Sequence, residues 1–432
     1  SNLIAAENLN LEEVTVKANR FERKESETTY ASEIHTSAQI EASGASTLYD
    51  FLAQQTSLNV LSNFGSRATP SINLRGYGGE NGYQNVVISL DGQRLNNIDM
   101  VPQLIAAIPL ANIDRIEISK GSGSVIYGDG ATAGAIQIYT KNKTGATITS
   151  SLGNYGQKNH ALNAGISEKY FDLSLTLAHD SHDGFSKRDN TGNKDKFDSN
   201  TQNVKLKIKP TDDLRFIAEG TSSRNNIGYA NLLTREQFNS NPRQAGTRAY
   251  TQQSFDTDQW RVGTEFDISK EITFSATHFQ EAKNSAFPTF SADYDYQSND
   301  INFNFDNEII SAVLGYQEFN GDRQGGFDVT SKDNRASFIQ TEYRPRWISD
   351  ALTLSAGARN EKVRYRYKPI VGGKLNDSES LNAWDFGLNY RFAPELSIFA
   401  NFNKGFQAPD IDRFFAFDAF FNVVFNGFIK PA

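Results

Sequence analysis

The chain has 432 residues, with 43 basic and 51 acidic side chains, and its formal net charge of −8 excludes a nucleic-acid scaffold. No run of 18 uncharged apolar residues occurs, so helical membrane spans are also excluded. The absence of cysteine excludes a disulfide framework, thiolate metal sites and a cysteine nucleophile. Residues 1–10 lack the basic and apolar pattern of a signal peptide, so we expect a chain that is mature or made without one.

The aromatic residues are unevenly distributed along the chain. Of 51 Phe, Tyr and Trp residues, nine lie in residues 1–142 and 42 in the remaining 290. The chain therefore changes character near residue 143, and we expect a boundary between two domains there.

Residues 21–142 carry the signals of a small mixed α and β domain. Ser46 is a capping-type residue that precedes apolar residues at helical spacing, which predicts a helix over 46–52. Asp91-Gly92 can adopt the positive φ angles of a tight turn and predicts a hairpin. Alternating apolar residues predict short strands at 86–90, 93–95, 115–118 and 136–139.

A glycine-rich loop runs from Gly121 to Gly134, between the last two of these strands. A dinucleotide-binding loop would need a glycine where Ile126 stands, and the Gly-Lys-Ser or Gly-Lys-Thr of a P-loop is absent. We therefore interpret the glycines as positions of tight turns and close backbone packing.

From residue 144 onward, apolar and polar residues alternate in segments of about ten residues. Leu173, Leu175 and Leu177 alternate with polar residues, so one face of the strand is apolar. Clusters of Asn, Asp, Gly and Ser separate the segments. The pattern predicts about thirteen strands, at 144–153, 157–167, 169–180, 200–210, 213–224, 255–269, 271–283, 293–306, 308–320, 332–344, 351–367, 380–392 and 395–406.

Both a soluble β-sandwich or propeller and a membrane barrel show such alternation. Strands in soluble proteins average about five or six residues, whereas a transmembrane β-strand needs about 9–11 residues, an apolar outer face and a polar interior. The connections are short at 269–270 and 307 but long and polar at 181–199, 225–254 and 368–379. Short turns on one side and long loops on the other are typical of a transmembrane antiparallel β-barrel, which we expect here.

Several short motifs follow one another in a fixed order. They are Pro70–Gly76, Val87–Gly92, Ile113–Gly121, Ser124–Gly128, Asn403–Ile411 and Gly427–Pro431. The chain resembles the TonB-dependent outer-membrane receptors in these motifs. The resemblance implies a TonB-binding segment and linker at 1–20, an α+β plug at 21–142, and a β-barrel at 143–432 whose lumen encloses the plug.

The resemblance also implies a location and a function. We expect an outer-membrane monomer that contacts lipid and lipopolysaccharide and imports a small-molecule chelate by TonB-driven plug movement. A ferric siderophore is the first expectation, while cobalamin, another cofactor, haem, another metal chelate and oligosaccharides remain open. A passive porin would explain the barrel but not the plug motifs. No enzyme and no cofactor are expected, because the five histidines lie outside any nucleophile or zinc-helix context.

The segment that resembles the family's Ton box comprises Glu12, Glu13, Val14, Thr15 and Val16. In an extended strand Val14 and Val16 lie on one face, which suits recognition by strand addition to a sheet edge of TonB. The same segment could instead be the first strand of the plug.

The family's barrel has about 22 strands, but about thirteen are predicted here. An open sheet edge is unstable in hydrocarbon, because each unpaired backbone group costs several kcal/mol. A cylinder of about thirteen strands would lack room for the plug. We therefore expect about nine further carboxy-terminal strands in the native polypeptide.

Three plug loops, at 64–69, 77–83 and 96–102, are expected to form an outward apex that binds the ligand. Tyr and Arg side chains suit recognition of chelates and rings. The ligand-facing candidates are Arg67, Tyr77, Asn81, Tyr83, Asn97, Asp99 and Met100, and the alternative for each is an ordinary solvated loop residue.

By the same resemblance, the basic plug residues Arg75 and Lys120 should pair with barrel glutamates, since a desolvated charge needs a partner. Glu265, Glu342 and Glu361 are the candidate partners.

An early polar loop is rich in aspartate. Its carboxylates could form an oxygen-rich structural calcium site, although the spacing of an EF-hand loop is missing, and a solvated polar loop is the alternative. The candidates are Asp180, Asp183, Asp189, Asp195 and Asp198.

Overall fold

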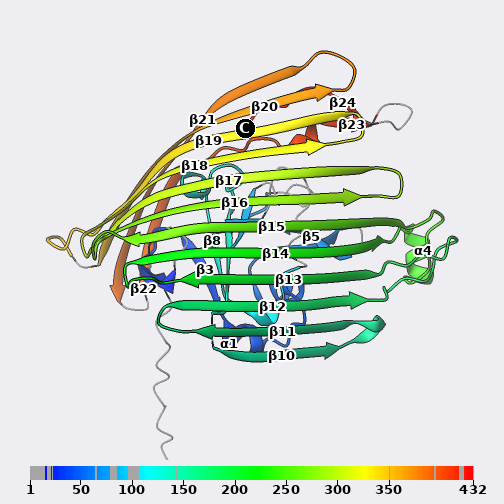
Figure 1. Cartoon of the computed structure of the whole chain (residues 1–432), viewed down its shortest axis with the longest axis horizontal. Coiled ribbons are helices and arrows are strands. Elements are labelled where there is room, and N and C mark those ends of the chain that lie inside the picture. Colours follow the sequence, from blue (N-terminus) through cyan, green and yellow to red (C-terminus); the bar gives the residue numbers. More distant parts are fainter. Residues whose placement is uncertain are drawn as a thin grey trace, which may run out of the picture.

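The fold consists of a large curved β-wall and a smaller mixed domain that lies against its concave face (Figure 1). The computed structural model describes residues 15–16, 21, 23–63, 66–77, 85–95, 105, 107–142, 144–349, 351–393, 396–417 and 423–431. We call the large sheet the wall and the smaller domain the plug.

The wall is a thirteen-strand antiparallel meander in which each strand pairs with its neighbours in sequence. Its strands are β10 (Gly145–Leu152), β11 (Lys158–Ser167), β12 (Phe171–His182), β13 (Phe197–Ile208), β14 (Leu214–Tyr229), β15 (Thr251–Asp267), β16 (Ile272–Ala286), β17 (Ser291–Asp306), β18 (Ile310–Gln324), β19 (Asp328–Tyr343), β20 (Leu352–Pro369), β21 (Leu375–Ala393) and β22 (Leu396–Lys404). The thirteen predicted strands are confirmed. Within the described residues, β10 and β22 form the two edges of the sheet.

Several strands extend further toward the long loops than the sequence predicts. β14 continues to Tyr229 rather than ending near 224, and β21 already begins at Leu375, inside the predicted loop at 368–379. Near the long loops the outward residues of β14 are polar, namely Ser222, Arg224 and Asn226, while Ile227 and Tyr229 are buried on the inner face. The outward apolar residues of this strand therefore end before the strand does.

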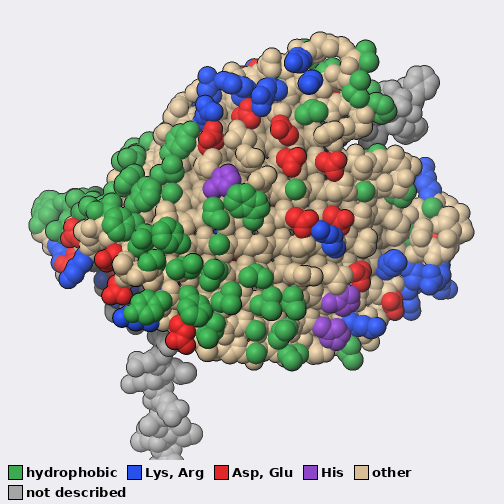
Figure 2. All heavy atoms as spheres, in the orientation of Figure 1, with side chains coloured by type: hydrophobic (Ala, Val, Ile, Leu, Met, Phe, Trp, Pro, Cys, Tyr) green, Lys and Arg blue, Asp and Glu red, His purple; other side chains and the backbone are tan. Residues whose placement is uncertain are grey.

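The outward face of the wall carries an apolar band on the side of the short turns. On β20 the outward residues Leu352, Leu354, Ala356 and Ala358 belong to this band, and Figure 2 shows apolar side chains gathered over the same half of the wall. Toward the long loops the outward side chains become polar and charged. An apolar outer band around a polar interior is what a membrane-spanning β-wall requires.

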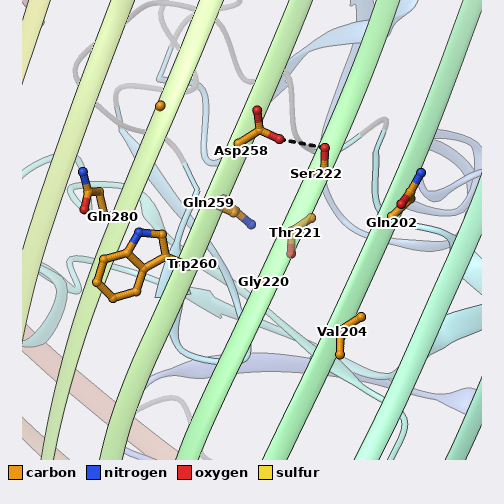
Figure 3. A pocket seen from close by; sticks show the side chains of 10 residues that line it. Gln202, Val204, Gly220, Thr221, Ser222, Asp258, Gln259, Trp260 and Gln280 are labelled. Atoms are coloured by element: carbon orange, nitrogen blue, oxygen red, sulfur yellow. Dashed lines mark hydrogen bonds between the residues drawn. The ribbon is translucent and has the colours of Figure 1, made fainter.

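The upper limit of the band is visible where Gly220 leaves a hollow of about 470 Å³ on the outward face (Figure 3). Val204 and Trp260 flank the hollow, while Ser222 and Asp258, joined by a hydrogen bond of 2.7 Å, lie above them. Trp260 thus stands at the boundary between apolar and polar surface, the position that aromatic girdles occupy.

The plug contains a five-stranded sheet in the order β3-β8-β9-β6-β7, with β6 and β9 parallel. The strands are β3 (Ala31–Thr36), β6 (Val86–Leu90), β7 (Gln93–Arg94), β8 (Ile113–Lys120) and β9 (Gly134–Thr140), beside a separate hairpin of β4 (Asn59–Asn63) and β5 (Ser66–Asn73). The predicted hairpin is confirmed, with φ of 48° at Asp91 and 83° at Gly92. Buried aliphatic and aromatic side chains form the plug core between the sheet and its helices.

The helices are short. They are α1 (Ser37–Ala42), α2 (Leu48–Gln55), α3 (Ser124–Tyr127) and α4 (Arg235–Ser240), the last in a long loop of the wall. The predicted helix is α2, but its N-cap is Thr47 and not Ser46. None of the described helices is long and apolar enough to cross a membrane.

The glycine-rich loop packs against backbone, as the sequence indicated. Gly134 has a φ of 152°, and a Cβ there would overlap the carbonyl oxygen of Ser119 on the neighbouring strand. Its lack of a side chain therefore permits the approach of β8 and β9.

Two small sheets complete the fold. β1 (Thr15–Val16) pairs with β2 (Arg23–Lys24), and β23 (Phe415–Phe417) pairs with β24 (Val423–Phe425). The segment after β22 returns to the inner face of the wall, where Ile411 and Phe414 pack with Tyr365.

Candidate functional site

The first described segment of the chain is anchored to the wall at its short-turn end. Arg23 of β2 donates from Nη2 to Asp306 Oδ1 (2.7 Å) and from Nε to Glu342 Oε2 (2.9 Å). The Glu342 side chain is 4% exposed, so its charge is almost fully desolvated. β1 pairs directly with β2, with Val16 opposite Arg23.

Three further contacts lie just after Arg23. Arg391 Nη1 pairs with Glu27 Oε1 (2.6 Å), Asn389 Nδ2 donates to the carbonyl of Thr28 (2.7 Å), and Thr29 Oγ1 lies 2.8 Å from Ser355 Oγ. We call Arg23, Glu27, Thr28 and Thr29 together with these wall partners the N-terminal clasp. A force applied at β1 and transmitted through β2 would reach this clasp before the five-stranded plug sheet.

The predicted TonB-binding segment overlaps β1. Thr15 and Val16 form this strand, which lies in a two-stranded sheet apart from the five-stranded sheet of the plug, while Glu12, Glu13 and Val14 lie outside the described residues. TonB binding by this segment stays a prediction.

Deeper in the lumen, wall cations meet plug carboxylates. Lys205 Nζ lies 2.8 Å from Asp91 Oδ2, and Lys332 Nζ lies 2.6 Å from Asp129 Oδ2. Burial alone would raise the pKa of Asp91, but the charge and hydrogen bond of Lys205 and hydrogen bonds from Thr140 lower it. Asp91 is therefore held ionised against the wall.

These ion pairs differ from the expected ones, in which Arg75 and Lys120 of the plug pair with glutamates of the wall. Lys120 binds Glu33 of the adjacent plug strand (2.9 Å), and Arg75 is exposed in the loop after β5 with a φ of 57°. Of the three candidate glutamates, Glu342 meets the plug through Arg23, whereas Glu265 and Glu361 pair with wall residues Arg215 and Arg359, respectively.

The polarity at the two buried pairs is the reverse of the prediction, because the wall supplies the cation and the plug the carboxylate. The alternation of β13 and β19 places Lys205 and Lys332 on the lumen face, but it cannot name a partner more than a hundred residues away. The Asp91-Gly92 sequence predicts a hairpin turn, but no sequence pattern indicates that Asp91 also pairs with Lys205 of the wall.

The ion pair of Lys120 belongs to a cluster inside the plug. Glu33 also accepts a hydrogen bond from the backbone of Ser57 (3.0 Å) and lies 2.8 Å from His35 Nε2. Burial alone would raise the pKa of Glu33, but hydrogen bonds from Ser57, Lys120 and His35 lower it to about 2.

At the long-loop end, the plug meets the wall through hydroxyl and amide groups. Thr69 of β5 lies 3.5 Å from the hydroxyl of Tyr229, which in turn donates to Gln253 (2.9 Å). Thr69, the last residue of the first expected apex loop, therefore lies beside the outer ends of β14 and β15.

Two of the seven ligand-facing candidates fall on described residues. Arg67 lies in β5, and Tyr77 is 46% exposed after it. The others, Asn81, Tyr83, Asn97, Asp99 and Met100, lie outside the described residues. All seven remain predictions.

The aspartates of the early loop bind backbone N–H groups rather than one another. Asp189 accepts from Thr191 N, Asn193 N and Tyr250 N, and Asp195 accepts from Ser186 N. Burial would raise the pKa of Asp189, but these hydrogen bonds lower it to about 2.

The remaining three aspartates lie elsewhere along this region. Asp180 stands on the lumen face of β12, Asp183 follows that strand, and Asp198 accepts from Asn200 Nδ2. Over the described ranges, no three acidic or histidine side chains are grouped so that they could hold a metal ion. The structure does not bring the five calcium candidates together.

A cavity of about 350 Å³ separates part of the plug from the wall. Asp91, Gln137 and Tyr139 line it from the plug, and Asp300 and Asn302 are among its lining residues on the wall. Both polar and apolar side chains line the cavity, and Asp91, Asp129 and Lys332 of the two buried ion pairs are among them. Plug movement at those pairs would therefore change the width of the cavity.

Comparison with known families agrees with this geometry. Residues 24–135 match the TonB-dependent receptor plug domain, and residues 123–431 match the TonB-dependent receptor-like β-barrel. The chain belongs to the TonB-dependent receptor family. Barrels of this family lie in the outer membrane of Gram-negative bacteria, and the apolar band of the wall is the surface that faces the lipid.

Individual relatives of this receptor are known by sequence and by structure. The vitamin B12 transporter BtuB of Vibrio cholerae serotype O1 is 25% identical over 426 residues, which cover 93% of this chain and 63% of that protein. The chain thus spans less than two thirds of the length of this relative.

Solved structures of TonB-dependent receptors share the fold. The ferric yersiniabactin uptake receptor FyuA of Yersinia pestis aligns with a TM-score of 0.73 and 15% identity, covering 88% of this chain and 65% of that one. The unliganded ferric citrate transporter FecA aligns with a TM-score of 0.75 and 14% identity, covering 89% and 64%.

Proposed function

We propose that this receptor imports a scarce chelate across the outer membrane by TonB-driven movement of its plug. The ligand binds among the long loops and the plug apex, and TonB pulls at residues 12–16 from the opposite, short-turn side. Family members are transport receptors, and no catalytic role is proposed.

The arrangement of β1 and the N-terminal clasp is the observation that carries this proposal. The segment similar to a Ton box ends in a strand that pairs with β2, and Arg23 of β2 pairs with Asp306 and Glu342. Tension on β1 would first separate β2 and the clasp from the wall. The tension would then act on the buried ion pairs Asp91–Lys205 and Asp129–Lys332.

Two chelate classes are the leading candidates for the cargo. A ferric siderophore is our first choice, in keeping with structural neighbours such as FyuA and FecA, whose names refer to ferric chelates. Cobalamin is the second, because the sequence relatives include vitamin B12 transporters. Both are large, polar chelates for which the aromatic and basic apex candidates are chemically suited.

Uptake assays with the receptor expressed from its own gene test the proposal. Val16→Pro removes a backbone N–H from the strand and should abolish uptake, while Val16→Thr keeps this donor and should not. A panel of ferric siderophores and cyanocobalamin identifies the cargo. Uptake by the proline variant that equals wild type and ignores the proton-motive force would favour a passive porin.

A further inference from the structure

The outward face of β20 changes from apolar to basic partway along the strand. Beyond Ala358, the outward positions are Asn360, Lys362, Arg364, Arg366 and Lys368, whereas the intervening Glu361, Val363 and Tyr365 are buried. Alternate residues of a strand lie about 6.6 Å apart, so the four cations extend over about 20 Å. Figure 2 shows the corresponding group of Lys and Arg side chains over the upper strands.

The flanking strands add one cation and few carboxylates. Arg335 of β19 stands opposite Lys362 and pairs with Glu318 (2.9 Å), while Asp333 stands opposite Arg364 and pairs with Arg366 (3.0 Å). We call Arg335, Lys362, Arg364, Arg366 and Lys368 the basic ladder. On the β21 side, the residues opposite the ladder are neutral, namely Ser380, Ser378 and Asn376.

The ladder retains uncompensated positive charge. In the part of the chain that the structure describes, Lys362, Arg364 and Lys368 have no carboxylate within 4.0 Å. Counting the exposed Asp322 of β18 as well, five cations face three carboxylates. Hydroxyl and amide groups of β21 provide neutral hydrogen-bonding groups beside the cations.

The ladder begins where the apolar band ends. Trp384 of β21 stands opposite Ala358 and is 40% exposed, and Tyr316 of β18 is exposed at a similar height on its strand. Exposed aromatic side chains at such a boundary mark the interface between hydrocarbon and headgroups. The ladder therefore lies at headgroup level, on the long-loop side of the membrane.

We propose that the basic ladder binds the phosphates of a phosphorylated glycolipid in the outer leaflet. A molecule bound here also contacts the apolar band, which favours a lipid over a soluble anion. Four cations in a row fit a headgroup with several phosphates better than one with a single phosphate, and arginine can bind phosphate with two parallel hydrogen bonds.

At β14 and β15, the boundary of the apolar band carries mainly negative charge. Above the hollow at Gly220, Arg224 is paired with Asp258 (2.8 Å) and lies near Asp256, so carboxylates outnumber the cation there. Phosphate groups would be repelled at that position. The charge pattern thus selects β20 and its neighbours.

Binding of purified receptor to lipopolysaccharide, to dephosphorylated lipopolysaccharide and to phosphatidylglycerol in detergent micelles tests this site. Wild type should bind phosphorylated lipopolysaccharide most tightly, with an affinity that falls as salt rises. A quadruple variant, Lys362→Gln, Arg364→Gln, Arg366→Gln and Lys368→Gln, should bind it at least about tenfold more weakly, since each cation near an anionic surface contributes.

A control removes four exposed cations elsewhere, with Lys158→Gln, Lys169→Gln, Arg235→Gln and Lys270→Gln, and should bind like wild type. The double variant Arg364→Gln and Lys368→Gln leaves the Arg366–Asp333 pair intact and tests the ladder if the quadruple variant does not fold. Equal weakening in the control, or no weakening in the folded ladder variants, would overturn the proposal. Phosphatidylglycerol binding as tight as that of lipopolysaccharide would overturn the assignment to a headgroup with several phosphates.

Discussion

Lys332 of the wall and Asp129 of the plug lie 2.6 Å apart, with side chains only 3% and 5% exposed. The same carboxylate accepts a hydrogen bond of 2.6 Å from the backbone N–H of Ala408, in the segment after β22. Wall, plug and returning segment therefore meet at one buried charge.

Loss of this cation should weaken plug docking strongly. Lys332→Met leaves Asp129 and the nearby Asp410 without their shared cation, and removal of one partner of a buried pair costs about 3–5 kcal/mol. Thermal unfolding and protease release of the plug measure the effect. Lys332→Met with Asp129→Asn should recover part of the loss, and Lys207→Met on β13 is the control. A single variant as stable as the control would contradict the role of the pair.

The clasp should control access to β1. Arg23→Gln removes the cation shared by Asp306 and Glu342, so we expect hydrogen exchange of the amides in residues 15–24 to rise by about tenfold or more. Arg224→Gln is a matched control, because Arg224 also has two nearby aspartates but is 44% exposed at the other end of the wall. Unchanged exchange at β1 in Arg23→Gln would show that the clasp does not hold the segment.

Acid should destabilise the plug through Glu33. Its folded pKa of about 2 lies below the ordinary value of 4.5, so its contribution to stability is complete above pH 4.5 and is lost as the pH falls toward 2. In Glu33→Gln the loss of stability between pH 4.5 and 2 should be smaller, as followed by thermal unfolding of the receptor. Glu168→Gln replaces an exposed turn glutamate and should keep the wild-type slope. Equal slopes in all three proteins would exclude Glu33 as a source of acid sensitivity.

Gly128 should tolerate a methyl group less well than Gly92. Both have positive φ, but a Cβ on Gly128 would lie 2.5 Å from Arg359 Nη2 and 2.8 Å from Glu361 Oε2, whereas a Cβ on Gly92 meets nothing within 4 Å. Gly128→Ala should therefore cost about 1–3 kcal/mol more than Gly92→Ala in unfolding experiments. Equal costs would mean that the wall side chains move aside freely.

The sequence predicted the wall well wherever its outer face meets lipid. The apolar outward residues of β20 and β21 produce an alternation that predicts both strands. Near the long loops, Ser222 and Arg224 of β14 face water, so nothing in their polarity distinguishes strand from loop. The strand ends that the sequence does not predict are therefore those that extend beyond the apolar band.

The contacts of the candidate site were harder to predict than the fold. Arg23 and Glu342 are 319 residues apart, and no local pattern records such a pairing. The resemblance predicts a wall partner for Lys120, yet its partner is Glu33 across the strand pair β3–β8, where the register brings the two side chains together. Partner choice depends on strand register and on plug orientation, which only three-dimensional packing determines.

The strands of the wall are taller than the lipid they cross. β20 has 18 residues and rises about 45 Å when tilted by about 40°, whereas the apolar band of such barrels is about 25 Å high. The surplus length stands in water as a stiff collar above the membrane. A bulky hydrophilic ligand can lie inside this collar without displacing the acyl chains of the membrane lipid.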